Sequence, residues 1–121
     1  MKRLSEKEEE LLRIIWNCKK AFAKEVREEM REPKPHINTV ATTLRRMSDK
    51  GFLKVEDFGT VHRYSAGITR KEYTNKFVKP MLKGIFGDSM KSVVSFFAEQ
   101  EEISPGELRE IIKMIEQKKK Q

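Results

Sequence analysis

One stretch, from Pro35 to Gly51, constrains the fold of this chain more than any other. Read at helical spacing, its apolar side chains Val40, Leu44 and Met47 lie on one face, which predicts a helix that packs on a core. Gly51 is a typical helix stop. The opposite face of this helix is polar and consists of Asn38, Thr39, Ala41, Thr42, Arg45 and Arg46.

That polar face has the chemistry of a helix that reads DNA in the major groove. Its amide, hydroxyl and guanidinium groups can hydrogen-bond base edges and phosphates, and no acidic side chain occurs before Asp49. A basic helix face that only meets solvent would have the same composition. The neighbouring segments must therefore decide between the two interpretations.

Two further helices are expected before this stretch. Ser5 and Glu8 form a capping-box pattern, and the apolar spacing that follows predicts a helix from about Ser5 to Asn17. Trp16 lies on its apolar stripe and is interpreted as a core residue rather than a ligand platform. A shorter helix is expected from about Ala23 to Glu32, before a proline-rich break. This order of helices is that of a helix-turn-helix unit.

The period of the pattern changes to two after Gly51. Alternation over residues 53–56 and 61–65 indicates a β-hairpin with its turn at Gly59-Thr60. A hairpin directly after a helix-turn-helix is a wing, and Lys54 and Arg63 would supply its positive charge to phosphates or the minor groove. A hairpin that merely covers the core is the alternative.

Large apolar residues then recur at helical spacing from about residue 69. A kink or break is expected near Lys79, and a last helix is expected with Ser104 as its N-cap. These stripes are too short to enclose a core, so we expect them to meet a second copy of the chain. The side chains expected at this dimer interface are Phe77, Met81, Ile85, Phe86, Val93, Phe97, Leu108, Ile111, Ile112 and Ile115.

Composition narrows the function classes. A net charge of +7 favours a polyanionic partner, nucleic acid before an anionic membrane surface. Cys18 is the single cysteine, which excludes an intrachain disulfide and a cysteine-cluster metal site, and we expect neither metal nor cofactor.

The charged start is no signal peptide, and no apolar run approaches the roughly 20 residues of a membrane span. We expect a cytoplasmic protein without membrane insertion, and no catalytic motif predicts an enzyme.

Together these patterns predict a mainly α fold with a small β-hairpin. A winged helix-turn-helix is expected over residues 1–68, followed by a C-terminal helical dimerisation region over residues 69–121. A winged-helix protein-interaction module and a ligand-sensing regulator without proteolytic induction remain open as alternatives. The residues expected to bind double-stranded DNA are Asn38, Thr39, Thr42, Arg45, Arg46, Lys54 and Arg63.

Over nearly its whole length the chain resembles the penicillinase repressor family. These are winged-helix repressors that control β-lactamase and methicillin-resistance genes, together with copper-responsive relatives. The motifs that carry the resemblance are LSEKEEELLRIIW at 4–16, TVATTLRRMSDKGFL at 39–53, VHRYSA at 61–66, FGDS at 86–89 and ISPGEL at 103–108.

The resemblance implies a homodimeric repressor that binds a dyad-symmetric operator through the helix near 38–50. It also implies induction by a membrane sensor-protease pathway that leads to a cut within the helix at about 89–100. The matching bond here is Phe96-Phe97, where relatives commonly carry Asn-Phe. Pro35-His36 stands where the family usually has Trp-Ser, which alters the start of the recognition helix. The cysteine pairs of the copper-responsive relatives are absent, since Cys18 is alone.

Overall fold

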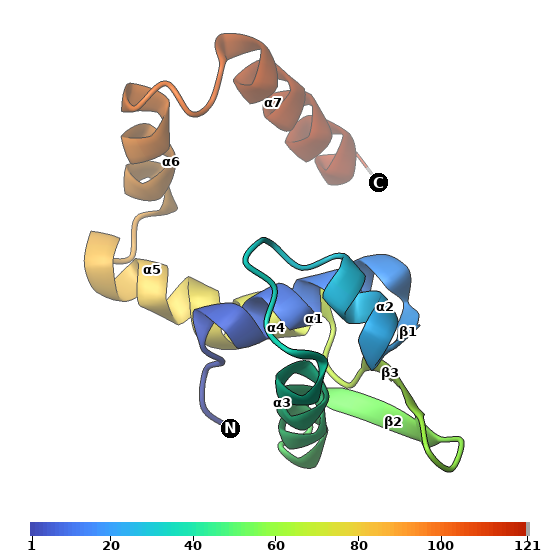
Figure 1. The fold of residues 1–121 in the computed structure, drawn as a ribbon. Helices are drawn as coiled ribbons and strands as arrows, with labels where there is room; N and C mark the ends of the chain where they lie inside the picture. Colours follow the sequence, from blue (N-terminus) through green and yellow to red (C-terminus); the bar gives the residue numbers. More distant parts are fainter. Residues whose placement is uncertain (121) are drawn as a thin grey trace. The chain divides into compact units, whose positions relative to one another are not determined.

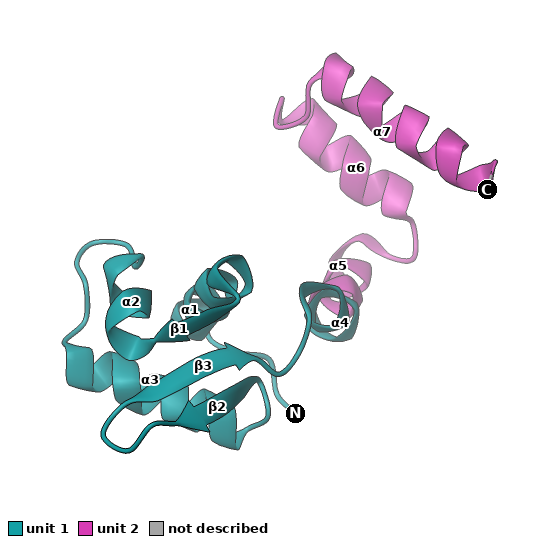
Figure 2. Cartoon of the chain, turned by 90° about the vertical axis from the view of Figure 1, so that its right-hand side faces the viewer, with its two compact units in different colours: residues 1–77 teal, residues 78–121 magenta. Residues whose placement is uncertain are grey.

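The computed structural model describes residues 1–120, which divide into two compact units (Figure 2). Unit 1 covers Met1–Phe77 and unit 2 begins at Val78. The sequence predicts a DNA-binding domain over residues 1–68 and a dimerisation region over residues 69–121. Unit 1 extends to Phe77 because Tyr73 and Phe77 pack on Phe52, with ring centroids 6.2 and 6.1 Å from that of Phe52.

Unit 1 combines helices with one three-stranded antiparallel sheet, ordered β1-β3-β2. β2 and β3 form the expected hairpin, in which Glu56 lies opposite Arg63. β1 pairs with the other edge of β3 and was not predicted, because three residues are too few to show an alternating pattern. The elements of unit 1 are α1 (Glu6–Cys18), β1 (Lys20–Phe22), α2 (Ala23–Glu28), α3 (Ile37–Asp49), β2 (Leu53–Asp57), β3 (His62–Ala66) and α4 (Arg70–Tyr73) (Figure 1).

The core of unit 1 confirms the predicted inner face of α3. Val40, Leu44 and Met47 are at most 1% exposed, and they meet the equally buried Val26 of α2 and Ile15 of α1 in the same core. With this face buried, the polar face of α3 is turned to solvent. The remaining buried apolar side chains of unit 1 are Leu4, Leu11, Leu12, Ile14, Ala21, Met30, Phe52, Leu53, Tyr64, Ile68 and Tyr73.

Local hydrogen bonds explain where the first two helices begin and end. The Ser5 hydroxyl accepts from the backbone N–H of Glu8 and the Glu8 carboxylate accepts from that of Ser5, which confirms the capping box. α2 ends at Glu28, earlier than expected. The backbone N–H of Arg31 donates to the Glu10 carboxylate of α1 at 2.9 Å, so it is not available to continue the helix.

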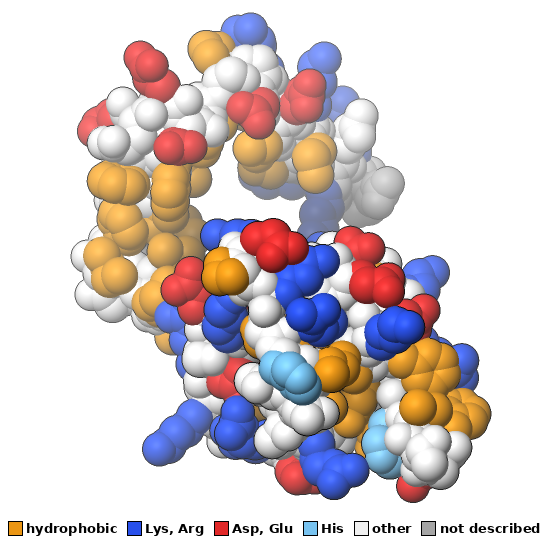
Figure 3. All heavy atoms as spheres, viewed as in Figure 1, with side chains coloured by type: hydrophobic (Ala, Val, Ile, Leu, Met, Phe, Trp, Pro, Cys, Tyr) orange, Lys and Arg blue, Asp and Glu red, His pale blue; other side chains and the backbone are white. Residues whose placement is uncertain are grey.

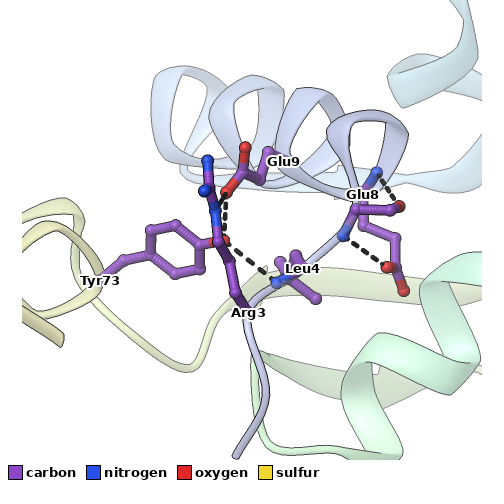
Figure 4. A network of polar contacts seen from close by, with 6 residues as sticks. Arg3, Leu4, Glu8, Glu9 and Tyr73 are labelled. Carbon is purple, nitrogen blue, oxygen red and sulfur yellow. Dashed lines mark hydrogen bonds and ion pairs between the residues drawn. The ribbon is translucent and has the colours of Figure 1, made fainter. Parts of the chain in front are cut away.

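Tyr73 of α4 ties the N-terminal segment to α1 (Figure 4). The backbone N–H of Leu4 donates to the phenol oxygen at 3.2 Å, and the phenol donates to the Glu9 carboxylate. Arg3 Nε lies 3.0 Å from the same carboxylate. Burial and the bond to Glu9 raise the pKa of Tyr73 from 10.0 to about 12.

We expect the protein to lose stability as the pH rises from 10 to 12. An unfolded Tyr73 ionises near pH 10, whereas the folded residue ionises near 12, so folding favours the neutral phenol. This stabilisation is complete below pH 10, is lost as the pH rises through 12, and amounts to on the order of 2 kcal/mol. Urea unfolding followed by Trp16 fluorescence should show this slope.

In Tyr73→Phe most of the alkaline loss of unfolding free energy should disappear. Tyr64→Phe is the control, because it removes the only other tyrosine and leaves the Tyr73 bonds in place. An unchanged slope in Tyr73→Phe would show that Tyr73 does not cause the alkaline loss.

Unit 2 contains α5 (Lys79–Phe86), α6 (Met90–Glu99) and α7 (Pro105–Lys119). The break expected near Lys79 is a π-helical turn, η1 (Thr74–Val78), and Pro80 stands in the first turn of α5, where a proline is tolerated. Ser104 caps α7, as the sequence predicted, and Ser89 caps α6. Within residues 1–120, every helix is too short or too polar to cross a lipid bilayer.

Candidate nucleic-acid interface

The outer face of α3 carries most of the residues that the sequence assigned to DNA binding. Because the opposite face of α3 is buried in the core, these side chains are held on a rigid element of unit 1. The first turn of α3 contains no acidic residue. The exposed members of this face are Asn38, Thr39, Thr42, Arg45 and Arg46.

His36 caps the start of α3. Its Nδ1 accepts a hydrogen bond from the backbone N–H of Asn38 at 3.1 Å, so a neutral ring carries its proton on Nε2. Arg27 of α2 donates to the carbonyl oxygen of Pro35 at 2.6 Å and ties the preceding turn in place. The sequence predicted an altered helix start here, because histidine is not among the residues that usually form a cap, and the structure shows that His36 does form one.

Two threonines of α3 bond to their own helix. Thr42 Oγ1 donates to the carbonyl oxygen of Asn38, and Thr43 Oγ1 donates to that of Thr39, both at 2.8 Å. Such bonds to the residue four positions earlier fix the side-chain rotamer. The side chains of Thr42 and Thr43 are therefore fixed before any partner binds.

The wing carries less free positive charge than the sequence suggested. Arg63 Nη2 lies 3.1 Å from both carboxylate oxygens of Glu56, and the guanidinium stacks 5.3 Å from the centroid of the Phe58 ring. Hydrogen bonds from Arg63 and then Lys20 lower the pKa of the Glu56 carboxyl. The charge of Arg63 is thus engaged within the sheet, whereas Lys54 is exposed on β2.

A pocket lies between the outer face of α3 and the wing, where Arg45 approaches His62 of β3. Arg45 Nη2 is 3.3 Å from His62 Nε2, and His62 Nδ1 is 3.6 Å from Oδ1 of Asp57 on β2. The sequence analysis left His62 out of the site, because a histidine on a strand gives no sign of its partner on a helix. The pocket is lined by Asn38, Ala41, Thr42, Arg45, His62 and Tyr64.

The residues predicted for a dimer interface differ in burial. Phe77 packs in unit 1, its ring centroid 4.8 Å from that of Tyr73, and Val93 is only 6% exposed within unit 2. Val93 is thus already covered in the single chain, whereas Phe77 is half-buried. Phe86 and Leu108 are half-buried, and the exposed members are Met81, Ile85, Phe97, Ile111, Ile112 and Ile115.

Hydrophobic side chains are conspicuous on the C-terminal helices (Figure 3). α7 has no extended packing against another element of residues 1–120, although its apolar stripe includes Ile112, which is 52% exposed. Phe96 and Phe97, at the predicted cleavage bond, are 44% and 39% exposed on α6.

The family model of the penicillinase repressor matches residues 4–117. The chain belongs to the penicillinase repressor family. Within this family it is 29% identical to the penicillinase repressor of Staphylococcus aureus, over 89% of this chain and 86% of the relative. It is 26% identical to the methicillin resistance regulatory protein MecI of S. aureus strain N315, over 95% and 94%. A penicillinase repressor of Bacillus licheniformis is also 26% identical, over 96% and 91%.

The fold of this penicillinase repressor family member is similar to the solved complex structure of hsRosR-S1. The TM-score is 0.53 at 12% identity, over 81% of this chain and 92% of that chain. The family and the fold confirm the predicted winged helix-turn-helix class. They also make the protein a DNA-binding transcriptional repressor and not an enzyme.

Proposed function

We propose that this repressor binds a dyad-symmetric DNA operator as a homodimer, with α3 as its recognition helix. The observation that carries the proposal is the outer face of α3, where amide, hydroxyl and guanidinium groups are exposed and acids are absent from the first turn. The major groove admits an α-helix, and these groups match its donors and acceptors. The net charge of +7 suits a polyanion.

The exposed apolar side chains of unit 2 support the homodimer. Ile85 is 70% exposed, and Ile111, Ile112 and Ile115 of α7 are 45 to 52% exposed. Contiguous apolar surface of this kind marks an interface. A two-fold dimer would cover it and would supply two recognition helices for two half-sites.

Relief of repression is proposed to follow cleavage of α6 near Phe96-Phe97 by a sensor-protease pathway acting in the cytoplasm. Both side chains are exposed, so a protease could reach them once α6 opens locally. Mass spectrometry of the protein from induced cells tests this directly. A fragment ending at Phe96 supports cleavage, and intact protein after induction rules it out.

Arg46→Ala is expected to weaken operator binding by about 1–3 kcal/mol without changing the fold, because Arg46 is exposed on the outer face of α3. The assay titrates the protein against DNA from its own upstream region and against a scrambled duplex of equal length. Arg109→Ala on α7 is the control, since it removes the same charge in unit 2. Equal affinity of Arg46→Ala and wild type would remove Arg46 from the interface.

The same titration separates this function from a winged-helix protein-interaction module. Binding that neutralises phosphates should lose affinity steeply between two salt concentrations and should prefer the operator duplex. Binding that ignores both salt and sequence would contradict the proposed function.

A further inference from the structure

One contact joins the wing to the recognition helix through two polar side chains. Arg45 Nη2 of α3 lies 3.3 Å from His62 Nε2 of β3, and the His62 side chain is 25% exposed. The other ring nitrogen, Nδ1, is buried, faces Asp57 Oδ1 at 3.6 Å, and has no hydrogen-bond partner within the described residues. The imidazole thus lies between a cation and an anion.

This arrangement selects one protonation state of the ring. A guanidinium can only donate hydrogen bonds, so Nε2 of His62 must carry a lone pair for Arg45 to bond it. The proton of the neutral ring is then on Nδ1, which is the nitrogen that faces the Asp57 carboxylate. Both neighbours favour the same tautomer, and a second proton on Nε2 would point at the guanidinium and break the contact.

We propose that His62 is a positioning residue, which holds Arg45 in the orientation that reads the operator and releases it when the ring becomes protonated. The inference rests on the proposed function, since it assigns a role within DNA recognition by α3. Arg45 and Thr42 line the same pocket as His62, so a fixed Arg45 lies beside the other groups that would meet a base edge. A released Arg45 still attracts phosphates but loses the direction that its bond to His62 gives it.

Charged groups of both signs surround His62. The acidic groups are Asp57 on β2 and Asp49 on α3, which lines a pocket together with His62. The basic groups are Arg45 on α3 and Lys24 at the start of α2, which lines a neighbouring pocket with His62 and Tyr64. Histidine is the side chain that changes charge between about pH 5 and 8. Sequence selectivity should therefore fall as the pH is lowered through this range, while affinity for any DNA rises with the added charge.

The first test needs no DNA. Nitrogen-15 NMR of the free protein at neutral pH is expected to show His62 as the Nδ1–H tautomer. Arg45→Ala should shift the Nε2 resonance, because it removes the only donor seen on that nitrogen within residues 1–120. An Nε2–H tautomer in the wild type would overturn the proposed contact.

The second test measures selectivity, defined as the ratio of the Kd for scrambled DNA to the Kd for the operator, at pH 7.5 and 5.5. All proteins carry His36→Ser, which replaces the other histidine by a cap that does not titrate. His62→Leu should lower selectivity roughly fivefold or more at pH 7.5 and abolish its pH dependence. His62→Gln, whose amide oxygen can accept from Arg45, should keep selectivity at both pH values.

The Arg45→Ala background provides the decisive comparison. If His62 acts through Arg45, His62→Leu should lower selectivity when Arg45 is present. In the Arg45→Ala background the same substitution should have no further effect on selectivity. An equal effect in both backgrounds would overturn the inference and leave the repressor function intact. A parent protein that binds both duplexes equally would overturn the proposed function and the inference together.

Discussion

Ile111→Glu is expected to convert the proposed homodimer into monomers and to weaken operator binding by roughly 100-fold or more. Ile111 is 45% exposed on the apolar stripe of α7, and a buried carboxylate there would have no partner. Two linked recognition helices bind far more tightly than one, because the second binding event is intramolecular. Sedimentation velocity and DNA titration on the same preparation should show both losses.

The matched control is Gln117→Glu, which adds the same charge to α7 outside its apolar stripe. Gln117 is exposed and polar, so this variant should remain a dimer and bind the operator like the wild type. A dimer that survives Ile111→Glu would place the interface elsewhere in the chain.

Gly67→Ala is expected to destabilise unit 1 by about 3 kcal/mol, the upper end of the range for overpacking. A Cβ at residue 67 would lie 2.7 Å from the carbonyl oxygen of Gly51 and 3.1 Å from the carbonyl carbon of Phe52. These are backbone atoms, and Gly67 N–H also donates to the Phe52 carbonyl oxygen at 2.8 Å, so neither segment can move without losing that bond. The clash falls where β3 leaves the sheet beside the end of α3.

Trp16 makes this effect easy to measure. It is the only tryptophan, and its indole N–H donates to the carbonyl oxygen of Ile68, next to Gly67, at 2.9 Å. Urea unfolding followed by its fluorescence reports directly on unit 1. Gly84→Ala is the control, because a Cβ there meets nothing within 4 Å and α5 should gain about 0.5–1 kcal/mol. If the urea midpoint of Gly67→Ala equals that of the wild type, the turn at Gly67 can rearrange at little cost in free energy.

The parts of the fold that sequence reasoning predicted well depend on local chemistry. The buried stripe of α3 and the caps Ser5 and Ser104 each involve residues a few positions apart, so their pattern is visible in the sequence. The hairpin was visible for the same reason. With its two-residue turn at Gly59-Thr60, it even implies that Glu56 faces Arg63, a pairing that the sequence analysis could have drawn and did not.

The parts that it missed depend on contacts between distant segments. β1 is a strand only because β3 lies beside it. The Phe77 ring packs on Phe52, which lies far from it in the sequence, and its part in a dimer interface stays a prediction. The contact between Arg45 and His62 needs the position of a helix relative to a strand, which no periodicity encodes.

The hydroxyl of Thr42 donates its hydrogen to the Asn38 carbonyl oxygen, and this restricts the hydrogen bonds that the outer face of α3 can make. Toward DNA, Thr42 can offer only a methyl group and an oxygen lone pair. A methyl group suits the C5-methyl of thymine, and a lone pair suits the amino group of adenine or cytosine. The base that Thr42 faces should then be adenine, thymine or cytosine in preference to guanine, whose major-groove edge presents acceptors alone.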